Sequence, residues 1–290
     1  MLTPVLKVAA IHDLSGFGRA SLSIIIPIIS TMGIQVCPAP TAILSTHTGG
    51  FENYTFIDLT EDLEKYLEHW KELKIRFNCI YTGFLGSPRQ ITIISNFINN
   101  LAFHNPLVVI DPVMGDNGLL YKTMTGDIVE EMCRFVNLAD IITPNYTEAA
   151  FLLGEKYKPY IKEAEIKEWL CRLSNMGPKT VIITSVPALA GKEGTNVAAY
   201  DRDDGRFWKV KCDYIPAHFP GTGDGFTSVI VGSILQGDSL PIALDRAVQF
   251  ITQAIRASYG YKYPEREGVL LERVLDNLKA PVTISSYEIL

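Results

Sequence analysis

The sequence lacks several signatures that would assign it to common protein classes. Its five cysteines are odd in number and form no C-x-x-C pair, so neither a disulfide framework nor a zinc site is indicated. No block of lysine and arginine is present and the net charge is −6, so we expect no nucleic acid partner. The most apolar stretch, Leu22 to Ile29, is shorter than the roughly 20 residues that a membrane span needs. With no signal-like amino terminus, we expect a reduced, cytoplasmic protein without a membrane partner.

Two nucleotide-binding motifs are also missing or incomplete. The G-x-x-x-x-G-K-[ST] phosphate loop is absent, so a lysine of that motif does not hold any bound ATP. Gly16-Phe17-Gly18 matches a dinucleotide fingerprint only in part, because Ser21 stands at the third glycine position. A Rossmann-type dehydrogenase is therefore the weakest alternative, and the absence of NAD binding would test it.

A glycine-rich segment is the most informative feature that is present. Pro220-Gly221-Thr222-Gly223-Asp224-Gly225-Phe226 leads into an apolar helical pattern, which places Asp224 in a predicted first helical turn. Unpaired N–H groups and the helix dipole favour a bound phosphate there. An aspartate can simply complement the dipole. Beside a phosphate it can instead take a proton from the attacking hydroxyl, which predicts a small-molecule kinase.

Acidic residues follow two other predicted strands. Asp111 and Asp116 come after the apolar run Leu107–Ile110, and Glu148 follows the strand at 140–143. The carboxyl ends of parallel strands form the ligand-binding edge of open α/β sheets. Capping explains Thr143-Pro144-Asn145-Tyr146-Thr147-Glu148 equally well. If the three carboxylates converge, they predict a site for Mg²⁺ that carries a nucleotide.

The chain alternates apolar strand patterns with helical patterns, which predicts a mainly parallel sheet covered on both faces. Strands are expected at 5–11, 34–38, 78–82, 107–113, 140–143 and 180–184. Helices are expected at 19–32, 63–73, 88–103, 127–138, 147–153, 163–176, 226–236, 241–258 and 268–278. A hairpin is expected at 196–200 and 206–211. We expect one domain over residues 1–290, with a flap at 48–60.

Several residues near the predicted strand ends have two interpretations. His47, in Ser45-Thr46-His47-Thr48-Gly49-Gly50, suits either a turn or a ligand contact. His12 and Asp13 are expected at the carboxyl end of the first strand, facing a ligand. The cysteines are expected to fill the core.

These motifs together resemble the pyridoxal kinases of the ribokinase-like superfamily. The resemblance rests on Asp111-Pro-Val-Met-Gly-Asp116, Thr143-Pro-Asn-Tyr-Thr-Glu148, Val181-Ile-Ile-Thr184-Ser185 and Gly221-Thr-Gly-Asp224, in this order. It extends to Ser45-Thr46-His47-Thr48 and Tyr81-Thr82-Gly83-Phe84, and so spans most of the chain.

The resemblance implies a three-layer α/β/α fold, a homodimer, and transfer of the ATP γ-phosphate to the 5′-hydroxymethyl group of pyridoxal, pyridoxine or pyridoxamine. By position, Asp224 is implied as the base, and the anion hole is implied at Gly221, Thr222 and Gly223. Mg²⁺, with water or a monovalent cation such as K⁺, is implied at Asp111, Asp116 and Glu148. The nucleotide phosphates are implied at Thr143, Asn145, Thr184 and Ser185. The ring contacts are implied at Asp13, His47, Thr48 and Phe84.

The chain departs from the family pattern in two places. Just after the first strand, where known members carry a serine that contacts the ring, it has His12-Asp13-Leu14-Ser15, and where they have tyrosine it has Phe84. Asp13 could pair with a protonated pyridine or an amine. Hydroxymethylpyrimidine kinase is the main alternative, although its members tend to carry cysteine at the position of Asp224. The alternative from another class is a noncatalytic protein that binds a nucleotide or a B6 vitamer. An ADP-release assay distinguishes such a protein from a kinase.

Overall fold

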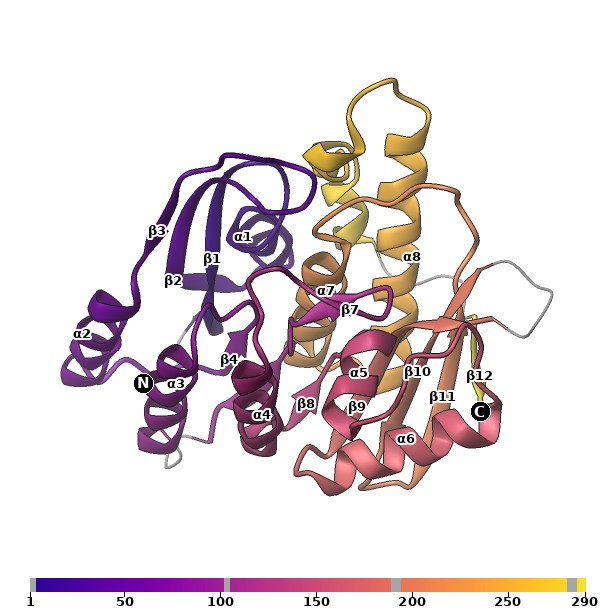
Figure 1. Ribbon diagram of the computed structural model, residues 1–290, viewed down its shortest axis with the longest axis horizontal. Coiled ribbons are helices and arrows are strands. Elements are labelled where there is room, and N and C mark those ends of the chain that lie inside the picture. Colours follow the sequence, from indigo (N-terminus) through magenta and orange to yellow (C-terminus); the bar gives the residue numbers. More distant parts are fainter. Residues whose placement is uncertain (1–3, 102–104, 189–193, 281–285) are drawn as a thin grey trace.

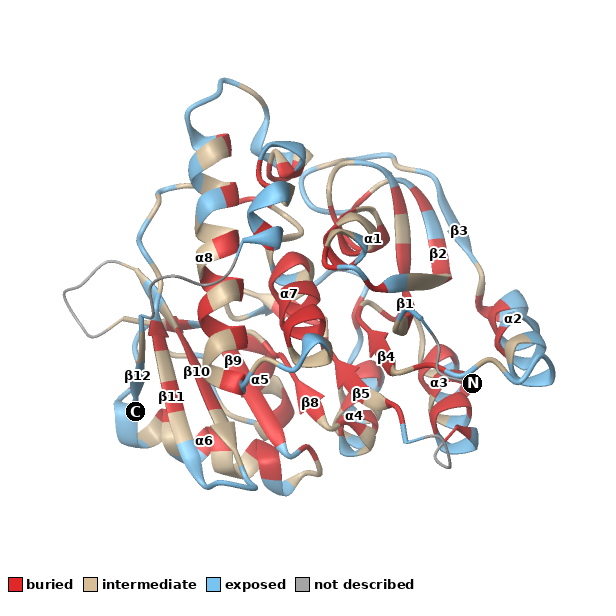
Figure 2. Ribbon diagram, turned by 180° about the vertical axis from the view of Figure 1, so that it is seen from behind, coloured by how far each residue is buried: buried red, intermediate tan, exposed pale blue. Residues whose placement is uncertain are grey.

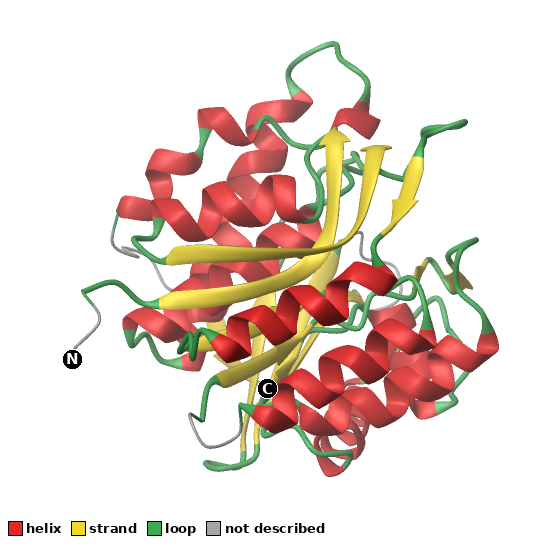
Figure 3. Ribbon diagram, turned by 90° about the vertical axis from the view of Figure 1, so that its left-hand side faces the viewer, coloured by secondary structure: helices red, strands yellow, loops and turns green. Residues whose placement is uncertain are grey.

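Helices cover both faces of one central sheet, which gives a protein of three layers (Figures 1 and 3). The structure is a computed structural model that describes residues 4–101, 105–188, 194–280 and 286–290. Within these residues the sheet has ten strands in the order β12-β11-β10-β9-β8-β5-β4-β1-β2-β3, and β6 pairs with β7 in a separate hairpin. The predicted α/β fold is confirmed.

The bounds of the elements are as follows. The strands are β1 (Lys7–Phe17), β2 (Gln35–Thr46), β3 (Phe56–Asp58), β4 (Cys79–Thr82), β5 (Leu107–Ile110), β6 (Gly115–Asp116), β7 (Leu119–Leu120), β8 (Ile141–Ile142), β9 (Thr180–Pro187), β10 (Thr195–Asp201), β11 (Arg206–Lys211) and β12 (Tyr287–Ile289). The α-helices are α1 (Leu22–Thr31), α2 (Thr60–Glu72), α3 (Pro88–Asn100), α4 (Gly126–Phe135), α5 (Tyr146–Leu153), α6 (Glu163–Asn175), α7 (Thr222–Gln236) and α8 (Leu240–Tyr259). Short 3-10 helices are η2 (Val136–Leu138), η3 (Glu265–Glu267), η4 (Leu271–Arg273) and η5 (Leu275–Lys279).

The centre of the sheet is parallel. Strands β2, β1, β4, β5, β8 and β9 each pair in parallel with their neighbour. All four residues of β4 are buried, as are three of the four in β5. Continuous apolar strands of this kind need cover on both faces. Because parallel strands end at one edge, the segments that follow them meet there.

Each face of the sheet has its own apolar core. Helices α2 to α6 pack on one face, and α1, α7 and α8 pack on the other. Figure 2 shows the second group in front of the sheet, with α7 buried along most of its length and α8 buried in part. This arrangement fixes the beginning of α7 beside the strand ends.

The first two strands are longer than predicted. β1 continues from Ile11 to Phe17, and β2 continues from Pro38 to Thr46, with pairing from Lys7–Gln35 to Phe17–Thr46. Pairing between the two strands satisfies the backbone hydrogen bonds of their polar residues, which the sequence alone would assign to loops. Asp13 therefore lies within a strand.

Three other segments need comment. The predicted hairpin is confirmed as β10 and β11. The predicted helix at 268–278 is wrong, because Gly268 has φ +80° and the Leu270 N–H donates to Ser258 Oγ (2.8 Å), leaving only the short helices η4 and η5. The helix predicted at 88–103 ends at Asn100, and residues 102–104 lie outside the described residues.

The segment predicted as a flap enters the sheet in part. Its residues Phe56–Asp58 form β3, which pairs antiparallel with β2 at the edge of the sheet. The flap itself stays a prediction. In the described part of the chain, no helix has both the length and the apolar character that crossing a bilayer requires.

Candidate active site

The carboxyl edge of the sheet brings together segments from distant parts of the sequence. Asp111 follows β5, Thr143 follows β8, and Thr227 lies in the second turn of α7. Thr227 Oγ1 lies 2.9 Å from Thr143 Oγ1 and 3.5 Å from Asp111 Oδ2. All three side chains are buried. The two acidic segments and the glycine-rich segment therefore meet at one place.

The glycine-rich segment forms a tight turn at the start of α7. Gly221 is the N-cap residue, has φ +80° and provides no side-chain cap. A Cβ atom at Gly221 would lie 2.1 Å from the Arg19 carbonyl oxygen, so only glycine fits there. A Cβ at Gly223 would meet no atom within 4 Å. The surface around Gly223 is thus open at the start of α7, where the N–H groups of a first helical turn suit an anion.

Asp224 lies in the first turn of α7, as predicted, and its side chain is half-buried. Its Oδ2 accepts a hydrogen bond from the Ser21 backbone N–H (2.8 Å). Burial raises the pKa of Asp224 to about 7, the Ser21 hydrogen bond lowers it, and the nearby Asp13 carboxylate raises it. A carboxyl group with a pKa near neutrality suits a proton acceptor in catalysis.

Two further carboxyl groups are buried near Asp224. Burial raises the pKa of Asp111 well above its ordinary value, and the charges of Glu148 and Asp224 raise it further. Burial also raises the pKa of Glu148, to about 8, although backbone N–H groups that donate to it lower the pKa. Carboxyl groups this close together repel one another when charged, so each disfavours ionisation of the others unless a cation binds between them.

Glu148 and Asn145 form the capping box predicted for α5. Asn145 Oδ1 accepts from the Glu148 N–H (2.9 Å), and Glu148 Oε2 accepts from the Asn145 N–H (2.8 Å). Glu148 Oε1 accepts from the Met114 N–H (3.0 Å), and Asn145 Nδ2 donates to the Gly115 carbonyl (2.8 Å). Glu148 and Asn145 therefore cap α5, and they also connect the loop after β5 to this helix.

Asp116 lies in the small β6–β7 hairpin and is only half-buried, although its charge is close enough to raise the pKa of Glu148. Its carboxylate accepts from the Asn117 N–H (2.8 Å) and from Asn117 Nδ2 (3.2 Å). Across the residues that the structure describes, no group of three or more His, Cys, Asp or Glu side chains is placed to hold a metal ion. The oxygen-rich edge still fits Mg²⁺, which commonly binds one or two carboxylates with phosphates and several waters.

Thr184 and Ser185 form a bulge in β9. Three steps along β9, from Ile183 to Val186, face two steps along β10, from Ala198 to Asn196. Ser185 is exposed and has φ +56°, a conformation that is uncommon for serine. Bulges of this kind redirect side chains at the ends of sheets, often beside active sites.

Asp13 is buried in β1, and both of its carboxylate oxygens have partners. Oδ1 accepts from Ser21 Oγ (2.5 Å) and Oδ2 accepts from Ser15 Oγ (3.3 Å). Burial raises the pKa of Asp13, and both serine hydroxyls lower it. Asp13 thus lies near Asp224, and its carboxylate contacts hydroxyl groups of the protein itself.

The other predicted ring contacts lie at the ends of β2 and β4. His47 Nε2 donates to the Arg266 carbonyl (2.7 Å), since Nδ1 accepts from the Gly49 N–H (3.1 Å). Both ring nitrogens of His47 are therefore occupied by backbone groups. Thr48 is exposed and Phe84 is half-buried.

His12 does not face a ligand, so this expectation is wrong. The side chain is fully buried, and its ring meets Tyr81 edge-on with 4.3 Å between ring centroids. Burial lowers the pKa of His12 to about 3. The side chain packs on Gly83, where a Cβ would lie 2.3 Å from His12 Nδ1.

Two residues of the site were missed in the sequence. Tyr81 donates its hydroxyl to the Asp224 carbonyl (3.4 Å), and Ser21 holds the Asp224 carboxylate. A serine before an apolar helical run is a sign of an N-cap, so Ser21 could have been recognised as a helix boundary. Nothing in the sequence indicates its contact with a residue about 200 positions away.

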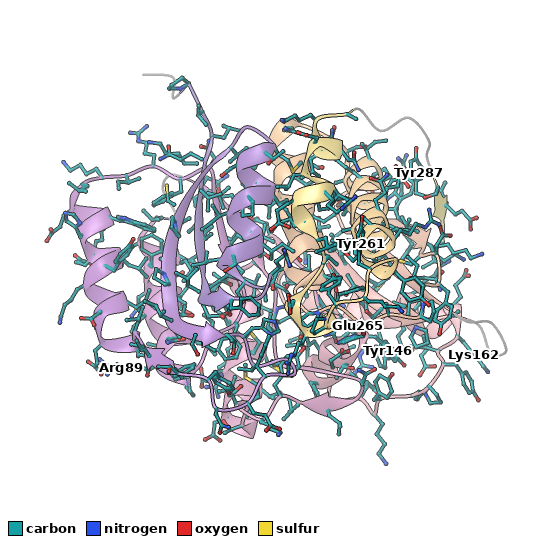
Figure 4. The ribbon with its side chains drawn as sticks, turned by 90° about the horizontal axis from the view of Figure 1, so that it is seen from above. Arg89, Tyr146, Lys162, Tyr261, Glu265 and Tyr287 are labelled. Carbon is teal, nitrogen blue, oxygen red and sulfur yellow. The ribbon has the colours of Figure 1, made fainter. Side chains whose placement is uncertain are left out.

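The segment from 261 to 268, which follows α8, lies over the carboxyl edge of the sheet. The view from above shows Tyr261 and Glu265 in this yellow segment (Figure 4). Glu265 accepts from the His218 N–H (3.3 Å), and the Glu267 carbonyl accepts from the Arg19 N–H (3.1 Å). The segment therefore joins the loop before α1 to the loop before α7.

Comparisons with known proteins agree with this geometry. The model of the phosphomethylpyrimidine kinase family matches residues 26–267. A crystal structure from Bacteroides thetaiotaomicron, provisionally named phosphomethylpyrimidine kinase and solved with pyridoxal, is 55% identical, covers 99% of this chain and 100% of its own, and has a TM-score of 0.95.

Two pyridoxal kinases are also similar to this chain. The structure from Lactobacillus plantarum is 29% identical, with a TM-score of 0.85, and covers 95% of this chain and 97% of its own. The sequence from Arabidopsis thaliana is 29% identical over 96% of this chain and 85% of its own length.

Proposed function

The chain belongs to the phosphomethylpyrimidine kinase family, within the ribokinase-like superfamily, and we propose that it transfers the γ-phosphate of ATP to the 5′-hydroxymethyl group of a B6 vitamer. The observation that carries this proposal is Asp224, which lies at the beginning of α7 among unpaired N–H groups and next to the acidic sheet edge. The pyridoxal in the Bacteroides relative, which shares 55% of its residues with this chain, supports the vitamer as acceptor.

In this reaction Asp224 accepts the proton of the substrate hydroxyl as that oxygen attacks phosphorus. Its raised pKa makes the carboxylate a stronger base while part of it stays ionised near neutral pH. The N–H groups of Thr222, Gly223 and Asp224 stabilise the charge on the transferring phosphoryl group. Gly221 allows the turn that points these groups toward the phosphate.

The acidic edge supplies the site for the cation of the nucleotide. Asp111, Asp116 and Glu148 would hold Mg²⁺ through water, together with a monovalent cation such as K⁺. When bound there, Mg²⁺ would supply positive charge that offsets the charge of the phosphates. Glu148 already accepts two backbone hydrogen bonds, which favours a contact through water.

The remaining predicted residues line the sites of the two substrates. Thr143, Asn145, Thr184 and Ser185 lie on the nucleotide side of the edge. Asp13, His47, Thr48 and Phe84 lie on the vitamer side. Phe84 can stack on the pyridine ring without the hydroxyl donor of a tyrosine. We further propose a cytoplasmic homodimer in which residues 1–290 form one domain.

Hydroxymethylpyrimidine kinase is the second candidate, and the name of the matching family favours it. Its substrate, like the B6 vitamers, carries a hydroxymethyl group on a heteroaromatic ring. The aspartate at 224 favours the B6 vitamers, because hydroxymethylpyrimidine kinases tend to carry cysteine at that position.

A phosphorylation panel tests the proposal. The purified protein is incubated with ATP, Mg²⁺ and, in turn, pyridoxal, pyridoxine, pyridoxamine and hydroxymethylpyrimidine, and ADP release is measured. We expect turnover with at least one vitamer. Turnover with hydroxymethylpyrimidine alone would replace the function with the second candidate, and no turnover with any acceptor would indicate a binding protein.

Substitution of Asp224 tests its role. Asp224→Ala should lower turnover by about 10²–10⁴-fold and leave ATP binding intact. Asp127→Ala is the matched control, because Asp127 also lies in a first helical turn but is exposed on α4. Near-normal turnover of Asp224→Ala would refute the assignment of the base.

A further inference from the structure

Ser21 makes two contacts that join two carboxylates of the site. Its backbone N–H donates to Asp224 Oδ2 (2.8 Å), and its hydroxyl donates to Asp13 Oδ1 (2.5 Å). The side chains of Ser21 and Asp13 are buried. Ser21 therefore links Asp13 in β1 to the first turn of α7 through one residue.

Ser21 does not act as an ordinary helix cap. It occupies the N-cap position of α1, yet its side chain makes no cap hydrogen bond. Its backbone has φ 52° and ψ −135°, a combination that serine rarely adopts and that costs about 1–3 kcal/mol. Such a conformation persists only where the surrounding structure imposes it.

The loop that carries Ser21 is held on both sides. A Cβ at Gly221 would lie 2.1 Å from the Arg19 carbonyl oxygen, and a Cβ at Gly268 would lie 2.9 Å from the same atom. The Arg19 guanidinium also pairs with Glu272 (3.0 Å). The loop is thus wedged between the glycine turn before α7 and the C-terminal segment, with the Ser21 N–H turned toward Asp224.

Asp13 is placed to act through Ser21 and less directly on a substrate. The Ser15 and Ser21 hydroxyls donate to its two oxygens, and only about 5% of the residue is exposed. The strong bond to the Ser21 hydroxyl fixes the side chain and, with it, the strained backbone. The orientation of the Ser21 N–H depends on that backbone.

We propose that Ser21 and Asp13 are positioning residues for the base: Asp13 locks the Ser21 hydroxyl, and the locked Ser21 backbone holds the Asp224 carboxylate against the attacking alcohol. This proposal rests on the proposed function for the reaction that Asp224 serves. It differs from the expected role of Asp13 as a contact of the vitamer ring, and the two roles affect different kinetic constants. A positioning role lowers kcat, whereas a substrate contact raises KM.

Kinetics of variants test the proposal. Ser21→Ala and Asp13→Ala should each lower kcat by about 10- to 100-fold, with the KM values for vitamer and ATP changed by less than about 2-fold. Asp13→Asn keeps an acceptor for the Ser21 hydroxyl and should recover most of the lost kcat. The double variant Ser21→Ala/Asp13→Ala should be no slower than the slower single variant, because both act in one chain of contacts.

A neighbouring serine provides the control. Ser23 lies on the same helix, and its hydroxyl donates to the Ser15 carbonyl (2.5 Å) without a contact to either carboxylate. Ser23→Ala should keep the kcat of the unmodified protein. Melting temperatures of all variants separate a kinetic effect from a loss of folding.

Three results would overturn the proposal. These are a kcat of Ser21→Ala equal to that of the control, an Asp13→Asn variant that raises the vitamer KM at unchanged kcat, and losses of kcat that multiply in the double variant. Failure of the proposed function looks different, since the unmodified protein would then phosphorylate no vitamer. In that event a crystal structure of Ser21→Ala decides, because the distance from residue 21 N to Asp224 Oδ2 should increase beyond about 3.5 Å, and an unchanged distance refutes the link.

Discussion

Replacing Asp224 by asparagine should make the protein more stable at alkaline pH while it removes activity. The carboxyl group has an ordinary pKa of 3.8, and burial raises it to about 7. Because the folded state raises the pKa, the carboxylate destabilises the fold increasingly as the pH rises from 3.8 through 7. The full difference corresponds to about 4 kcal/mol. Half-burial leaves some water at the group, so we expect a gain of about 2 kcal/mol for the asparagine variant above pH 8.

The gain should depend on pH in a defined way. Asparagine keeps an oxygen that accepts from the Ser21 N–H, so the contact at 2.8 Å survives while the charge is lost. At pH 8.5 the melting temperature should rise by roughly 4–8 °C, at about 2–4 °C per kcal/mol for a chain of this size. At pH 4 the wild-type group is protonated, and the two proteins should melt together.

Calorimetry or circular dichroism at both pH values measures this difference, and the same samples are assayed for turnover. Activity should fall by about 10²–10⁴-fold in the variant that gains stability. A stabilisation of equal size at pH 4 and pH 8.5, or none at pH 8.5, would refute the reasoning that burial of the charge costs free energy.

Three further predictions concern single residues. Gly221→Ala should lower both the melting temperature and kcat, because the φ of +80° costs about 1–2 kcal/mol for alanine and the Cβ overlaps the Arg19 carbonyl; a variant with unchanged melting and turnover would contradict this packing. Gly83→Ala should destabilise the fold by about 1–3 kcal/mol, since its Cβ would lie 2.3 Å from His12 Nδ1. Gly126→Ala is the control and should be neutral in the same urea titration, because its Cβ would meet nothing within 4 Å. Equal urea midpoints for the two variants would contradict the close packing of His12 on Gly83. Asp116→Asn should raise the Mg²⁺ concentration needed for half-maximal activity several-fold, and an identical metal titration would remove Asp116 from the cation site.

The central fold could be predicted because its signals are local. Buried runs such as Leu107–Ile110 are apolar throughout, and the proline after Ser87 marks the start of α3 with the serine side chain accepting from the Gln90 N–H. Strand ends were harder to predict. The continuations of β1 to Phe17 and β2 to Thr46 depend on pairing between the two strands. The polar residues in these continuations give no local signal of that pairing.

The candidate site was predictable to the same extent. Asp224 at the start of α7 follows from glycine spacing and the apolar pattern behind it. The meeting of Asp111 with Thr227 follows from strand order, which a single sequence does not contain. Ser21 was missed because the helix predicted to begin at Arg19 begins only at Leu22, after the φ of 52° at Ser21. Its two partners are brought near only by the completed sheet.

The wedge around Arg19 has a consequence for synthesis of the protein. The Arg19 N–H donates to the Glu267 carbonyl, and its guanidinium binds Glu272, so a loop made early in translation is fastened by residues made near the end. Until residues 267–272 have left the ribosome, Asp224 at the start of α7 lacks the contacts that hold the loop of its partner Ser21. Nascent chains should therefore stay unable to consume ATP until residue 272 has emerged, and a ribosome-arrested series that ends before and after this point would time the onset of activity.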